Sequence, residues 1–131
     1  MNKFGLEFVY RHAWCSSYKI VWSGAALDIL VTFECDDIEL GISRPQAAAF
    51  ENFINQAAEL MRLCGQELRQ QLEGSSACET FPTEIFLTRD RFSDGTEFCI
   101  MFDSPVEPEL GLAIRFRNEK IDHFGIQDDV L

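Results

Sequence analysis

The chain has 131 residues, 22 of them acidic and 11 basic, so its formal net charge is −11 at pH 7. Hydrophobic residues make up 47% of it, including 12 phenylalanines, which suits a packed core and excludes a disordered acidic tail. No segment approaches the about 20 apolar residues of a membrane span, and the first residues lack the apolar stretch of a signal peptide. We therefore predict a single cytoplasmic α+β domain over residues 1–131, with the phenylalanines dominating its core.

Four strands are predicted in the first third of the chain. Residues 4–10 form the first, and residues 18–22 alternate in character up to a turn at Ser23-Gly24. The same alternation continues over residues 27–34 and 38–42, which predicts two further strands.

One long helix is predicted over residues 44–73. Ser43 and Gln46 have the spacing of a capping box, and Pro45 suits a first helical turn. Apolar residues then recur every three or four positions: Phe50, Phe53, Ile54, Ala57, Leu60, Met61, Cys64, Leu68 and Leu72. Gly65 predicts a bend or a close contact in the middle of this helix, and Gly74-Ser75-Ser76 ends it.

Four more strands are predicted after the helix, over residues 85–87, 98–102, 110–116 and 120–125. Ser93-Asp94-Gly95-Thr96 is a hairpin signal, Asn118-Glu119 predicts the last turn, and residues 98–102 are apolar on both faces, as in a central strand. The fold class that follows is α+β: a largely antiparallel sheet of order ββββ-α-ββββ, packed against one long central helix.

The sequence contains no arrangement of residues that predicts catalysis. His12 and His123 have no partner at metal-ligand spacing, and no nucleophile elbow or phosphate-binding loop is present. The cysteines are odd in number and form no C-x-x-C pair, so we expect reduced thiols: Cys15, Cys35, Cys64, Cys78 and Cys99. We therefore predict no catalytic, cofactor-binding or metal site.

The acidic excess is concentrated in predicted turns, where side chains are free to meet a partner. Residues 34–39 carry a charge of −4 and residues 103–109 carry −3. The predicted partner-binding residues are Glu34, Asp36, Asp37, Glu39, Asp103, Glu107 and Glu109. Arg115 and Arg117 share one strand face and are expected to pair with nearby acids, so nucleic acid is not an expected partner. An acidic surface is also repelled by anionic membranes, so we expect no membrane partner.

The predicted helix begins with the pattern Q-x-x-A-[FY]-x-x-F, formed here by Gln46, Ala49, Phe50 and Phe53. Before it lie the runs Trp22-Ser23-Gly24, Leu27-Asp28-Ile29-Leu30-Val31, Ile38-Glu39-Leu40 and Ser43-Arg44-Pro45. About half of the chain thereby resembles the small immunity proteins of bacterial polymorphic-toxin and contact-dependent growth inhibition systems. The resemblance implies a cytoplasmic domain that binds and neutralises a cognate toxin, many of which are nucleases with basic clefts. The matching residues carry a cap and a core, so no binding residue is transferred from the family.

The first functional hypothesis is therefore an immunity-type protein that neutralises a basic toxin domain, acting as a monomer or a weak homodimer. The alternative is a non-catalytic oligomeric interaction domain, whose exposed sheet edges pair with a second copy or another chain. An enzyme would need Cys15 beside His12, or Cys99 beside Asp103, in a setting that lowers the thiol pKa. An acidic protein is a poor host for such a thiol.

Overall fold

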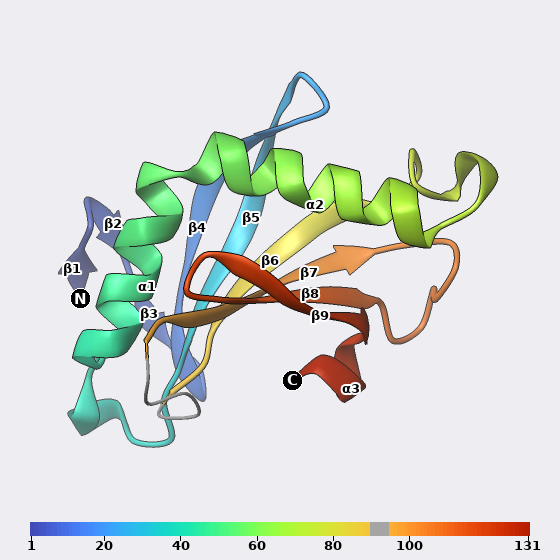
Figure 1. Cartoon of the computed structure of the whole chain (residues 1–131). Coiled ribbons are helices and arrows are strands. Elements are labelled where there is room, and N and C mark those ends of the chain that lie inside the picture. Colours follow the sequence, from blue (N-terminus) through green and yellow to red (C-terminus); the bar gives the residue numbers. More distant parts are fainter. Residues whose placement is uncertain (90–94) are drawn as a thin grey trace.

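The computed structural model of the chain describes residues 1–89 and 95–131 (Figure 1). Its main sheet has the order β3-β4-β5-β6-β7-β8-β9. The strands are β3 (Val9–Tyr10), β4 (Ala13–Trp22), β5 (Ala25–Glu34), β6 (Phe81–Leu87), β7 (Glu97–Asp103), β8 (Leu112–Arg117) and β9 (Lys120–Ile126). A separate hairpin consists of β1 (Asn2–Lys3) and β2 (Leu6–Glu7). The helices are α1 (Arg44–Asn55), α2 (Ala57–Gln71), α3 (Gln127–Val130) and the 3-10 turns η1 (Ile38–Leu40) and η2 (Gly74–Ser76).

Helices α1 and α2 lie on the same face of the sheet (Figure 1). The strands alternate accordingly: Ile29, Val31 and Phe33 of β5 point into the core beneath the helices. The core is rich in phenylalanine, as predicted, and its fully buried rings are Phe8, Phe33, Phe50, Phe53, Phe98, Phe102 and Phe116. On the opposite face, Val130 of the short α3 packs on Cys99 and Ala113.

The prediction of a mostly antiparallel α+β sheet is confirmed. Among the described strands of the main sheet, only the neighbours β5 and β6, which α1 and α2 connect, run parallel. The turn at Ser23-Gly24 joins β4 to β5 with positive φ at both residues, 50° and 81°, as the tight hairpin turn requires. Strand β7 is buried from Glu97 to Phe102, as predicted for a central strand. The predicted hairpin signal at 93–96 includes residues 93 and 94, which lie outside the described residues.

The prediction of one long helix is wrong, because the chain breaks at Gln56 into α1 and α2. Gln56 leaves helical geometry, with φ −126° and ψ 20°, and the two helices meet at a corner (Figure 1). Its side chain donates from Nε2 to Glu119 Oε2 at 3.0 Å, which ties the break to the turn between β8 and β9. Gly65, where a bend or a close contact was expected, lies within the continuous α2, and a Cβ added there would lie 3.3 Å from Arg69 Nη1. The capping box of Ser43 and Gln46 is present as predicted.

Two predicted strands are also wrong, so the order ββββ-α-ββββ is not observed. Residues 38–42 contain the turn η1, where Asp37 Oδ1 accepts a hydrogen bond from the Glu39 N–H at 2.9 Å and Gly41 has φ 66°. Residues 4–10 begin with the turn at Phe4-Gly5, where φ is 57° and 75°, and then form two short strands, β2 of the β1–β2 hairpin and β3, in place of one strand. In the part of the chain that the structure describes, no helix is long and apolar enough to cross a membrane.

Candidate protein-binding surfaces

The first predicted acidic segment, residues 34–39, follows β5 and surrounds η1. Glu34 is half-buried, and its Oε1 accepts a hydrogen bond from the Arg89 N–H at 2.8 Å. Asp37 caps η1, while Asp36 and Glu39 are exposed. Glu34 and Asp37 therefore have structural roles. Asp36 and Glu39 are the two acids of this segment whose side chains have no such role.

The second predicted acidic segment is part of a larger group that we call the acidic pole. Its members are carboxylates on neighbouring loops at one end of the sheet: Glu73, Glu79, Asp103, Glu107, Glu109, Asp128 and Asp129. All are exposed except Glu107, which is half-buried. Within residues 1–89 and 95–131, none of their side chains makes a hydrogen bond or an ion pair, and Arg69 in the last turn of α2 pairs with none of them. The acidic pole is therefore not neutralised by the described basic side chains.

Buried contacts hold the loops of the acidic pole together. The hydroxyl groups of Thr80 and Ser104 are hydrogen-bonded at 2.7 Å, joining the loop before β6 to the loop after β7. Gly111 donates to the Glu107 carbonyl at 2.9 Å and accepts from the Gln127 N–H at 3.1 Å, so that α3 lies against the same loop. Gly111 has φ 72°, and an added Cβ would lie 2.8 Å from the Phe102 carbonyl. Glycine is thus required where these segments meet.

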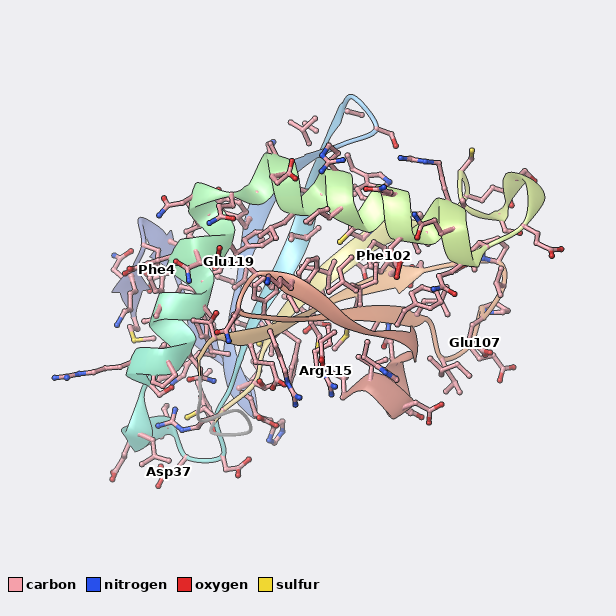
Figure 2. All side chains as sticks on the ribbon, in the orientation of Figure 1. Phe4, Asp37, Phe102, Glu107, Arg115 and Glu119 are labelled. Carbon is pink, nitrogen blue, oxygen red and sulfur yellow. The ribbon has the colours of Figure 1, made fainter. Side chains whose placement is uncertain are left out.

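The two predicted acidic segments lie at opposite ends of the sheet. In β6, Phe81 pairs with Asp103 of β7 at one end, and Leu87 pairs with Phe33 of β5 at the other. These ends are about 20 Å apart, at roughly 3.3 Å per residue. Asp37 and Glu107 accordingly lie on opposite sides of the molecule in Figure 2. The seven predicted residues therefore form two separate surfaces.

Arg115 and Arg117 pair with acids, as predicted. Arg115 Nη2 lies 2.5 Å from Asp122 Oδ2, and Arg117 Nε donates to Glu97 Oε1 at 2.8 Å. Glu97 is buried and also accepts a hydrogen bond from Thr88. The hydrogen bond that Arg117 donates to Glu97 is the main cause that raises the pKa of the Arg117 guanidinium. These charged side chains pair with one another within the sheet, and Figure 2 labels Arg115 among them.

Of the residue pairs considered for an enzyme, Cys99 and Asp103 lie in different surroundings. Cys99 is fully buried under α3, whereas Asp103 is exposed four residues further along the same strand. His12 is exposed, and the Cys15 thiol is 3.6 Å from the Ala13 carbonyl. Burial raises the pKa of the Cys64 thiol far above its usual range, which makes this thiol unreactive. The described residues include no group of three potential ligands that could hold a metal ion.

The comparisons with known proteins give no relative. No family model matches the chain, and no match is found among curated proteins or among solved structures.

Sequence reasoning missed four members of the acidic pole: Glu73, Glu79, Asp128 and Asp129. Their charges were visible in the sequence, but they lie in three segments that only the folded sheet brings to one end. Charge counted by segment shows how many acids a loop has, and the strand register shows which loops are neighbours.

Proposed function

We propose that this chain is a non-catalytic binding protein of the immunity type, which neutralises a basic toxin domain by docking it at the acidic pole. The observation that carries the proposal is the set of seven carboxylates with no ion-pair partner among the described residues. A protein that needed these charges only for solubility would tolerate them scattered over its surface. Gathered at one end, they attract a basic surface and accelerate association with it.

The rigid framework of the acidic pole supports this role. The loops that carry the carboxylates are joined through buried Thr80 and Ser104 and through Gly111, so their backbones are positioned before a partner arrives. A surface that is ordered in advance loses less entropy on binding. A nuclease domain with a basic cleft fits this chemistry, because carboxylates can occupy the positions of nucleic-acid phosphates.

The test measures how fast the chain associates with the protein encoded by the neighbouring gene, in stopped-flow experiments at several salt concentrations. The association rate should fall at least about tenfold between about 0.01 M and 0.15 M salt, where the Debye length shortens from about 30 to 8 Å. Replacing two members of the acidic pole, Glu107→Lys with Glu109→Lys, should slow association about tenfold at low salt. Neither side chain makes an ion pair or a hydrogen bond among the described residues, so the variant should still fold.

The matched control reverses charge at the other end of the sheet, with Asp36→Lys and Glu39→Lys, both exposed. The two variants are compared at about 0.15 M salt, where the control should change the rate less than the Glu107 and Glu109 variant does and by less than about threefold, because that end is about 20 Å away, beyond two Debye lengths. If the control slows association more than the Glu107 and Glu109 variant does, the toxin docks at the η1 end and the acidic pole is not the binding surface. A rate that is independent of salt would contradict the electrostatic proposal as a whole.

A further inference from the structure

A second binding surface lies along the outer edge of β4. Strand β3 covers only the beginning of this edge, where Val9 pairs with Cys15 and Tyr10 with Trp14. Beyond Ser16, whose hydroxyl donates to the Glu7 carbonyl at 2.7 Å, no described strand pairs with the outer edge of β4 up to Trp22. This edge is long for a protein that avoids association, because an unpaired strand offers its backbone groups to another chain.

The backbone groups that face outward can be assigned from the hydrogen bonds at both ends of β4. At its start, the Ala13 carbonyl accepts from the Arg11 N–H on the β3 side. At its end, Trp22 and Ala25 flank the two-residue turn, so Trp22 bonds toward β5. Successive residues of a strand point their backbone N–H and C=O groups to opposite sides. Counting from Ala13 or from Trp22 assigns the odd-numbered residues of β4 to the outer edge. The N–H and C=O groups of Ser17, Lys19 and Val21 therefore point away from the sheet.

A groove of about 410 Å³ runs beside this edge, with the first turns of α2 as its other wall. The strand contributes Tyr18, Lys19, Ile20 and Val21, and the helix contributes Ala57, Ala58, Met61 and Arg62. Because Ala57 and Ala58 have short side chains, the helix leaves room beside the strand. The groove thus combines unpaired backbone groups on one side with an apolar wall on the other.

We infer that the edge of β4 and the first turns of α2 bind an extended peptide segment of a partner protein, which adds to the sheet as a further strand. Its alternate side chains face the apolar wall at Ala57 and Met61, and the side chains between them face Lys19. Added strands gain affinity from the main chain and specificity from alternate side chains. The inference stands independently of the acidic pole, which lies at another part of the molecule.

The charge of Lys19 defines the chemistry of the peptide. Its nearest acid is Asp28 at 3.9 Å, and both side chains are about 70% exposed, so this ion pair is weak. Arg62, by contrast, is held by Glu59 at 2.6 Å. An incoming carboxylate opposite Lys19 would form a cross-strand pair of opposite charge. The segment that fits is therefore extended, free of proline, and alternates apolar with acidic residues.

A second copy of this chain fits the same edge less well. Antiparallel pairing of two β4 edges about Lys19 would bring two lysines directly opposite each other, which is destabilising. Each copy also carries a net charge of −11, and because this repulsion grows with the charge of the partner, it opposes a second copy more than it opposes a short peptide with few acids. A lysine in the middle of an edge strand is a known device against such self-pairing.

The test uses the full chain and a display library of random peptides of about six residues, the usual length of a strand. We expect enrichment of peptides that alternate apolar and acidic residues. The best peptide is then added to the protein, and amide hydrogen exchange is measured residue by residue. Exchange at Ser17, Lys19 and Val21 should slow at least about tenfold, while Tyr18 and Ile20, already bonded to β5, should change little. This alternation is the signature of strand addition.

Three variants separate the parts of the site. Val21→Pro removes an outward N–H without breaking a bond inside the sheet, and should weaken peptide binding at least about fivefold. Lys19→Glu should also weaken binding of the acidic peptide about fivefold. Ala58→Glu narrows the groove and adds a charge that repels the acidic peptide, so it should weaken binding. The control Ala48→Glu places the same side chain on an exposed position of α1 and should leave binding unchanged.

The inference is overturned if no peptide is enriched, or if protection from exchange appears elsewhere on the protein. It is also overturned if sedimentation shows a dimer of the parent chain that Val21→Pro dissociates, because the edge would then be occupied by a second copy.

Discussion

Glu84 differs from the solvent-facing carboxylates because it lies within the sheet. On the face away from α1 and α2, its neighbours in register are Leu30 of β5 and Met101 of β7. These apolar neighbours leave it half-buried, and burial raises the pKa of its carboxyl above the ordinary 4.5, although the Thr32 hydroxyl nearby opposes this shift. The protonated form is therefore favoured in the folded chain.

We predict that Glu84→Gln stabilises the protein at neutral pH and loses this advantage in acid. A carboxyl whose pKa is raised by folding contributes its full stability below the unfolded pKa, and this contribution is lost as pH rises through the folded pKa. The free energy of unfolding of the variant should therefore rise relative to that of the parent as the pH increases past about 4.5. Urea unfolding between about pH 3 and 7 measures the difference. Glu51→Gln, at an exposed position of α1, controls for the loss of one negative charge. A difference between Glu84→Gln and the parent that does not change with pH would contradict the prediction.

At the scale of the elements, hydrophobic periodicity predicted the long strands and failed at the interruptions. Buried positions at 46, 49, 50 and 53 in α1 and at 60, 61, 64 and 68 in α2 keep intervals of three and four around Ala57. The apolar stripe therefore continues through the break at Gln56, where neither glycine nor proline interrupts the sequence. Similarly, Ile38, Leu40 and Ile42 alternate as in a strand, yet Ile38 and Leu40 are exposed, because Asp37 and Gly41 form a local turn.

Gln46 is the residue by which α1 is fixed to the sheet. It is 1% exposed, and its Nε2 donates to the Glu34 carbonyl at 2.8 Å and to the Leu87 carbonyl at 3.0 Å. Its Oε1 accepts from the Ser43 N–H at 3.0 Å in the capping box. One side chain thereby joins the start of α1 to the ends of the parallel strands β5 and β6.

We predict that Gln46→Leu, which keeps the approximate volume, lowers the free energy of unfolding by about 2–4 kcal/mol, because buried backbone groups lose their partners. Chemical denaturation measures the change. The control Gln70→Leu, on an exposed position of α2, should stay within about 0.5 kcal/mol of the parent. A similarly small change for Gln46→Leu would show that α1 is fixed by its phenylalanines alone.

At the scale of the molecule, the sequence could predict the amount of charge and its location in loops, but not how those loops are arranged. Asp103 and Glu107 were predicted together with Asp37, yet the parallel pairing of β5 and β6 sends these acids to opposite ends. The sequence likewise did not predict the unpaired outer edge of β4. A strand pattern states which face is buried, whereas the short β3 that leaves most of the edge unpaired is a property of tertiary structure.

The acidic pole should cost the folded state stability, because unpaired like charges held close together repel each other. Neutralising two of them with Glu107→Gln and Glu109→Gln should therefore raise the free energy of unfolding by up to about 1 kcal/mol at low salt, and the gain should shrink as salt screens the repulsion. Thermal unfolding at two salt concentrations measures this. The control Glu59→Gln removes a negative charge that is paired with Arg62 and should give no gain in the free energy of unfolding.

The double variant Glu107→Gln with Glu109→Gln should also associate more slowly with a basic partner. If the variant is more stable than the parent but binds less well, the two charges serve binding at a cost in stability. Loss of stability in the double variant would instead mean that the carboxylates support the fold, and the acidic pole would no longer be evidence for a partner.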